Sequence, residues 1–153
     1  MDAIMLNIRS RSMIMKPLCV LTALILVGPC AAHAKFCSPK DAEAADALVD
    51  GLDSWAKLGV AVKHYGHCDD GSIAEGNSEA VARLLVDQWK TLPQLARLVR
   101  RDPLLKRFIL NHIDATLDTD DLVKIRTFAS TSCPDGAALL CTEVLAAANR
   151  ASQ

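Results

Sequence analysis

The sequence predicts an all-α fold: a small orthogonal bundle of about five helices with two disulfides, formed after removal of a signal peptide. Three observations indicate this fold. Apolar residues recur at helical spacing through most of the chain, and no segment alternates with a period of two. Prolines and capping residues interrupt the helical pattern at short intervals, which favours short connections. Four cysteines follow an export signal, and an even number of cysteines in an oxidising compartment indicates disulfides.

The first 34 residues have the three parts of a secretory signal peptide. A basic n-region contains Arg9, Arg11 and Lys16. The apolar run Leu18–Val27 follows it, and the small residues Ala32 and Ala34 end the segment. The apolar run is too short to span a bilayer comfortably, and the small residues suit a signal peptidase. We therefore expect residues 1–34 to be removed and residues 35–153 to form one helical domain in the periplasm with no stable membrane anchor.

Two variations on this export signal are alternatives. Translation from Met13 or Met15 would leave a leader of more usual length and the same exported product. A lipoprotein would need a small residue before Cys30, and Pro29 is a poor one. We therefore keep the cleaved signal peptide as the prediction.

Charge is nearly balanced overall but unevenly distributed. The chain has 17 basic and 18 acidic residues, and the leader holds three of the basic ones and one acid, so the exported part is mildly acidic, which argues against nucleic-acid binding. Residues 41–79 carry nine acids against two bases, whereas residues 83–107 carry seven bases against two acids. The two halves should attract each other or offer opposite faces to a partner. Ordinary solvated helix faces are the alternative.

The exported part keeps four cysteines: Cys37, Cys68, Cys133 and Cys141. Three connectivities are open. We favour Cys37 with Cys68, because this bond ties the start of the first helix to the segment after it. The remaining pair, Cys133 with Cys141, requires the chain to fold back over the start of the last helix. An exchange of partners between the pairs stays an alternative.

The first helix should run from about Pro39 into the low sixties, because Ser38 offers an N-cap and Pro39 suits the first helical position. Gly51 and Gly59 would weaken it by roughly 1 kcal/mol each. Residues 66–77 contain three glycines and no helical period, so we expect a loop.

The remaining helices follow from caps and prolines. Their expected starts are Asn77 or Ser78, Pro93 for a short continuation, Asp102-Pro103, Asp118 or Thr119, and Pro134 for a last helix to about Arg150. Trp55 and Trp89 are expected in the core, and His112 is expected to be a buried or half-buried histidine on an apolar face.

Motifs for catalysis or metal binding are absent. Gly71-Ser72 lacks the second glycine of the hydrolase elbow, and no glycine-rich phosphate loop with a lysine occurs. One cluster holds metal-ligating residue types: His64, His67, Cys68, Asp69 and Asp70. Its spacing is not that of a zinc site, and we expect Cys68 to be oxidised. The sequence therefore predicts no enzyme activity, no metal and no cofactor.

A glycine- and acid-rich loop on a small exported helical scaffold favours a binding protein. With these features the chain resembles the small periplasmic immunity proteins that protect bacteria from type VI secretion amidase effectors, and the related resistance-associated proteins. The likeness rests on the leader, an early long helix and the placement of the cysteines. Cys37 lies near the mature N-terminus, the glycine-rich segment Cys68 to Asn77 begins at a cysteine, and Cys133 and Cys141 form a late pair.

In that family an all-helical protein, often a dimer, blocks its effector by inserting a loop into the active-site groove. The resemblance therefore implies a secreted amidase-type effector as protein partner, a homodimer as one assembly, and an inserting loop made of Asp69, Asp70, Gly71, Ser72, Ile73, Ala74 and Glu75. Its acids would face a catalytic Cys-His site or the basic surroundings of that site.

Two alternatives stay open. An envelope scaffold or stress protein would bind a resident periplasmic partner through a basic strip: Arg97, Arg100, Arg101, Lys106 and Arg107. The other alternative is a small hydrolase or a metal carrier.

Overall fold

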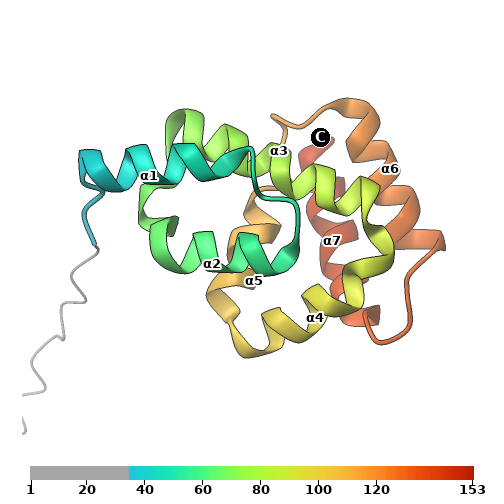
Figure 1. Cartoon of the computed structure of the whole chain (residues 1–153). Coiled ribbons are helices and arrows are strands. Elements are labelled where there is room, and N and C mark those ends of the chain that lie inside the picture. Colours follow the sequence, from blue (N-terminus) through green and yellow to red (C-terminus); the bar gives the residue numbers. More distant parts are fainter. Residues whose placement is uncertain (1–34) are drawn as a thin grey trace, which may run out of the picture. The chain divides into compact units, whose positions relative to one another are not determined.

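The computed structural model describes residues 35–153, which are helical almost throughout (Figure 1). The predicted signal peptide, residues 1–34, lies outside the described residues. Within them there is no strand and there are seven α-helices: α1 Pro39–Val49, α2 Trp55–Tyr65, α3 Gly71–Asp87, α4 Leu92–Arg101, α5 Pro103–Asn111, α6 Thr119–Thr131 and α7 Ala138–Ala151. Two 3-10 turns, η1 Gly66–Cys68 and η2 Trp89–Thr91, precede α3 and α4. The all-α prediction is confirmed, with seven helices where about five were expected.

The first expected helix is two helices, and this prediction was wrong. The helix breaks after Val49, and Ser54 starts α2 by accepting a hydrogen bond at Oγ from the backbone N–H of Lys57. The break reverses the chain, so that α2 runs back beside α1 (Figure 1). Leu52 and Trp55, on either side of the turn, are both buried. Burial of these two side chains favours the turn over one continuous helix.

The segment expected to be a loop is mostly helical, which is a second correction. α3 begins at Gly71, six residues before the expected cap at Asn77, because the Asp70 carboxylate caps it through a 2.8 Å hydrogen bond from the Gly71 N–H. The expected loop, residues 66–77, therefore consists of η1, a two-residue link and the first two turns of α3. The three glycines are the reason why composition favoured a loop here.

α3 runs across the middle of the bundle, with α1 and α2 at one end and α6 and α7 at the other (Figure 1). Nine large side chains in the core are almost fully buried: Leu58, Val81, Leu84, Leu85, Leu92, Leu95, Ile109, Ile125 and Val144. Trp55 and Trp89 are buried as expected, and their indole N–H groups donate to Thr91 Oγ1 at 2.8 Å and to the Ser132 carbonyl at 2.7 Å. No helix in residues 35–153 is long and apolar enough to cross a bilayer.

Both favoured disulfides are confirmed: Cys37 is bonded to Cys68, and Cys133 to Cys141. The second bond explains why α7 starts at Ala138, four residues after the expected Pro134. Residues 134–137 form a turn in which the Ala137 N–H donates to the Pro134 carbonyl, and Gly136 has a φ of +78° that an L side chain rarely adopts. This turn lets Cys133 fold back over the helix start.

Gly76 allows α1 to pack closely on α3. A Cβ added at Gly76 would overlap Cγ1 of Val49, a stiff β-branched side chain. We expect Gly76→Ala to destabilise the protein by about 1–3 kcal/mol through overpacking, although alanine is the better helix former. Gly59→Ala is the matched control, because its Cβ would meet Leu105 at 3.4 Å, an ordinary contact. Urea unfolding should find this control unchanged or up to about 1 kcal/mol more stable; equal stabilisation by both variants would contradict the close-packing argument.

Candidate functional site

The corner between α2 and α3 is fixed by three consecutive side chains that reach different partners. His67 binds Asp41 of α1, Cys68 is bonded to Cys37, and Asp69 binds His112. The corner is therefore tied to the N-terminal segment, to α1 and to the residue that follows α5. Such cross-links leave little conformational freedom in residues 67–69.

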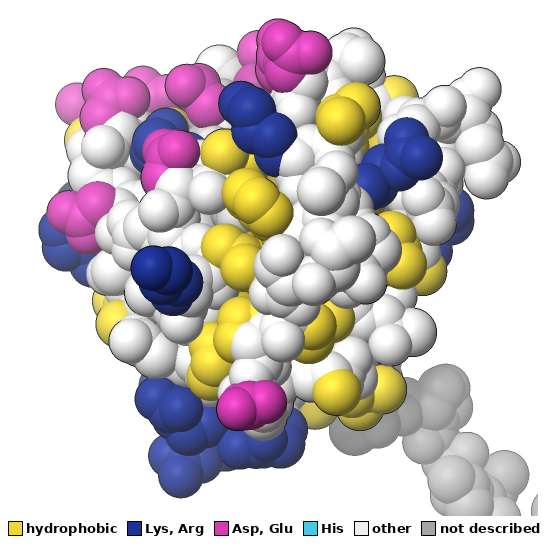
Figure 2. Space-filling view, turned by 90° about the vertical axis from the view of Figure 1, so that its right-hand side faces the viewer, with side chains coloured by type: hydrophobic (Ala, Val, Ile, Leu, Met, Phe, Trp, Pro, Cys, Tyr) yellow, Lys and Arg dark blue, Asp and Glu magenta, His cyan; other side chains and the backbone are white. Residues whose placement is uncertain are grey.

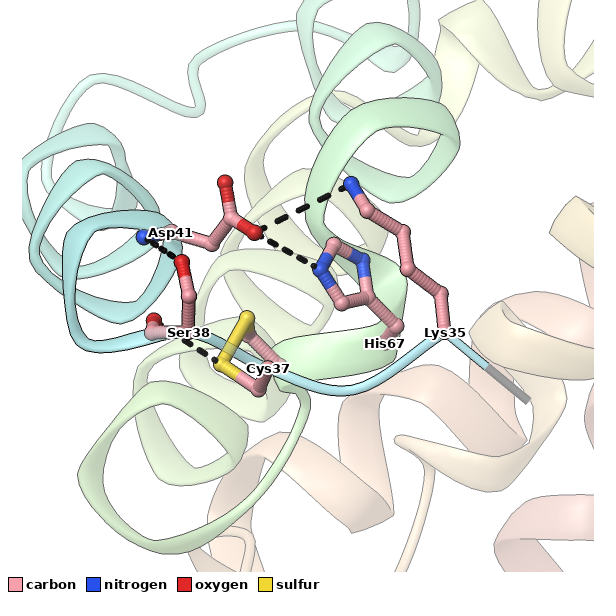
Figure 3. Close-up of a disulfide and its surroundings, with 6 residues drawn as sticks. Lys35, Cys37, Ser38, Asp41 and His67 are labelled. Carbon is pink, nitrogen blue, oxygen red and sulfur yellow. Dashed lines mark hydrogen bonds and ion pairs between the residues drawn. A yellow bond between two sulfur atoms is a disulfide. The ribbon is translucent and has the colours of Figure 1, made fainter. Parts of the chain in front are cut away.

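The N-terminal side of this corner is drawn in Figure 3. The Asp41 carboxylate lies 3.3 Å from Nε2 of His67 and 3.9 Å from Nζ of Lys35. Ser38, the N-cap of α1, accepts a 3.1 Å hydrogen bond from the backbone N–H of Asp41. The hydrogen bond with His67, supported by Ser38, lowers the pKa of Asp41 below its usual value. The carboxylate is therefore held in its charged form next to the disulfide.

The other side of the corner contains a buried serine–histidine–aspartate chain. Ser78 Oγ is 2.8 Å from Nδ1 of His112, and Nε2 of the same ring is 2.9 Å from Oδ2 of Asp69. Asn77 donates a 3.0 Å hydrogen bond to the second oxygen of Asp69. Because a carboxylate can only accept, a neutral His112 carries its proton on Nε2 and accepts from the Ser78 hydroxyl at Nδ1. No buried side-chain N or O atom in the described residues lacks a hydrogen-bond partner.

The Ser78–His112–Asp69 network has the residue types of a hydrolase triad, but its burial indicates a structural role. Ser78 is only 4 % exposed and His112 only 5 %, so a substrate has no open approach to the hydroxyl. Phe108 covers the imidazole, with ring centroids 4.2 Å apart. The network connects α3, the end of α5 and the corner. Burial of His112 confirms the sequence prediction for this residue.

Sequence analysis missed this network because its members are far apart in the chain and follow no local motif. One signal was present: Asn77 and Ser78 are polar residues on the helix face that continues with the apolar Val81, Leu84 and Leu85. Polar residues on a face that is otherwise buried need internal partners. His112, on the apolar face of α5, was the other half of that signal.

The pKa of Asp69 predicts acid sensitivity. Burial raises this pKa, but the hydrogen bonds from His112 and Asn77 outweigh burial, so the pKa lies below its usual value. A lowered folded-state pKa contributes stability that is complete above the unfolded value of about 3.9 and is lost as the pH falls through the folded value. We expect Asp69→Asn to be less stable than wild type at about pH 7, and the difference to shrink at about pH 3, measured by urea unfolding. A constant difference would contradict this assignment.

The seven residues expected to form an inserting loop do not share one environment. Asp69 points inward to His112, and Asp70 caps α3. Ile73 and Ala74 are half-buried, whereas Asp70, Gly71, Ser72 and Glu75 are exposed. Gly71 has a φ of +53°, which favours glycine, and nothing lies within 4 Å of the place where a Cβ would be. The predicted segment is thus a capped helix start with an exposed polar face.

The basic strip expected on α4 and α5 is largely exposed. Arg97, Arg100, Arg101 and Arg107 are exposed, but Lys106 is half-buried and donates to Glu143 at 2.8 Å. Figure 2 shows the α6–α7 end of the molecule, where one group of Lys and Arg side chains lies at the lower left and several Asp and Glu side chains lie at the top and upper left, with single charges of both signs between them.

The described residues form a small, disulfide-stapled, all-α domain, and they bring together no group of three or more side chains suited to a metal ion. No protein-family model matches the chain, and no curated protein or solved structure matches it significantly.

Proposed function

We propose that the protein is an exported periplasmic binding protein, an immunity protein that neutralises a secreted cell-wall-degrading effector. One observation carries the proposal: cross-links hold the α2–α3 corner in place, and the start of α3 that follows it is exposed and polar. The disulfide and two histidine–aspartate pairs hold residues 67–69, while Ser72 and Glu75 extend into solvent from the next two turns. A surface ordered before binding loses little conformational entropy in a complex.

The contacting element in this proposal is the start of α3, not a free loop. Asp70 and Glu75 give it negative charge for a catalytic cleft with basic surroundings. Asp69 contributes indirectly, by orienting the corner. The two disulfides support export, because such bonds persist in oxidising compartments.

A contact competition on a solid surface tests the proposal. A deletion mutant should die beside a secretion-competent parent and survive beside a secretion-deficient one. The full gene should rescue it, and a copy without residues 1–34 should not. Equal growth of mutant and parent would contradict the immunity function.

Surface variants locate the contact. We expect Ser72→Arg combined with Glu75→Lys to weaken effector binding at least about tenfold, because both side chains are exposed and Glu75 would reverse its charge. Asp87→Lys, also an exposed acid on α3 but at the other end of the helix, is the matched control and should bind normally. Unchanged protection and affinity in the double variant would remove this face from the interface.

A second candidate function rests on α4. Its inner face is buried through Leu92, Leu95 and Val99, while Arg97, Arg100 and Arg101 are exposed and form no ion pair with a described residue. An envelope scaffold or stress protein would use this face for an acidic resident partner. Capture of that partner should fall with rising salt and in the double variant Arg97→Glu, Arg100→Glu. Capture that neither salt nor the double variant changes would exclude this second function.

A further inference from the structure

An open cleft of about 690 Å³ lies beside the corner, between the N-terminal segment, the end of α2, η1 and α5. It does not include the exposed start of α3, but His67 and Asp69 of the corner line it, and so does Arg107 of the basic strip. Three cationic side chains from three different segments line it, Lys35, Lys63 and Arg107. Its apolar part is formed by Val62, Leu104 and Phe108.

The positive charge in this cleft is incompletely compensated. Lys63 and Arg107 form no ion pair with a described residue, and Lys35 is 3.9 Å from Asp41. Asp69 is the one acid that lines the cleft, but its two oxygens already accept hydrogen bonds from His112 and Asn77. An entering anion would therefore meet two cations, Lys63 and Arg107, that form no ion pair with a described residue.

The apolar part of the cleft includes one exposed leucine. Leu104 is 64 % exposed beside the half-buried Phe108, and the two residues lie one helical turn apart on α5. Arg107 projects from the same stretch of α5, so a guanidinium group stands next to an exposed apolar surface. A guanidinium group binds carboxylates in a bidentate manner, and its neighbours can bury an attached hydrocarbon group.

We propose that this cleft binds a carboxylate joined to an apolar body, with Arg107 and Lys63 on the carboxylate and Leu104 and Phe108 against the apolar part. Two sources have this chemistry: a free medium-chain carboxylic acid, and the C-terminal apolar residue of a peptide. The proposal does not rest on the immunity function, because it is argued from the cations and apolar side chains of the cleft and its test uses the purified protein alone.

The test is a titration of the ¹⁵N-labelled protein, purified from the periplasm, with octanoate and with an acetylated dipeptide ending in phenylalanine. We expect saturable shifts centred on Gly66, Phe108 and Asn111, with at least about tenfold weaker binding of octanamide and of the peptide amide. Saturation by octanoate alone identifies a free carboxylic acid as the source, and saturation by the peptide alone identifies a chain terminus. No saturable shift with either probe, or equal binding of the neutral amides, overturns the proposal.

Two substitutions localise the binding. Arg107→Glu, and separately Lys63→Gln, should each weaken it at least about fivefold, since each removes one cation from the cleft. Arg100→Glu is the control, because Arg100 is an exposed arginine on α4 that does not line the cleft, and it should bind as wild type does. Arg107 and Lys63 are both exposed, so circular dichroism should find each variant folded. Wild-type affinity in both cleft variants overturns the assignment.

Discussion

Replacing Cys37 and Cys68 together by serine should lower the free energy of unfolding by about 3–4 kcal/mol. The two cysteines are 31 residues apart, and the bond removes the conformational freedom of that long loop from the unfolded chain. It also ties the N-terminal segment to the corner, where Cys68 is buried. Urea unfolding at about pH 7, with linear extrapolation, measures the loss.

The Cys133–Cys141 bond provides the matched control. These cysteines are only eight residues apart, so the same double replacement by serine should cost about 2–3 kcal/mol. Cys141 is as deeply buried as Cys68, so the burial of one serine is common to both variants. A loss as large for the short loop as for the long one would contradict the loop-entropy argument.

His112→Ala should destabilise the protein by about 3–4 kcal/mol, the largest effect expected of a single substitution outside the apolar core. The variant leaves the Asp69 carboxylate and the Ser78 hydroxyl without their shared partner and opens a cavity beside Phe108. His64→Ala is the control, since His64 is exposed at the end of α2 and should change stability by less than about 0.5 kcal/mol.

A double-mutant cycle separates the network from the cavity. Combining His112→Ala with Asp69→Ala should recover at least about 1 kcal/mol relative to the sum of the single losses, because no carboxylate is then left without the hydrogen bond from His112. Additive losses would mean that His112 stabilises by packing alone. This result would also bear on function, since the proposed contact surface at the start of α3 directly follows the corner that Asp69 orients.

Strong local signals predicted correctly where α5 and α6 begin, and placed the start of α4 one residue late, at Pro93. Asp102 is both the C-cap of α4 and the N-cap of α5, and Asp118 is the N-cap of α6, so these starts need no distant partner to define them. The cysteine pairing was also predicted, because it joined the ends of locally defined segments.

The wrong predictions at residues 50–54 and at residues 66–77 have a common cause. Residues 66–77 and residues 50–54 were interpreted from glycine content and apolar spacing, whereas packing decided both. Gly76 lies in a helix because α1 packs against it so closely that a Cβ would overlap Val49. The chain turns at residues 50–54 because this turn buries both Leu52 and Trp55. Propensity differences of about 1 kcal/mol are smaller than the burial energy of such side chains.

The sequence by itself determined the helical class and the starts of α1, α5 and α6, because helical periodicity and caps act over short stretches of chain; it favoured the disulfide pairing, which the structure confirmed. Only the tertiary structure brought Asp69, Ser78 and His112 together, and only it assembled a cleft from Lys35, Lys63 and Arg107. These groups come from segments far apart in the sequence. Their proximity depends on how α2, α3 and α5 pack against one another, and no local pattern encodes that packing.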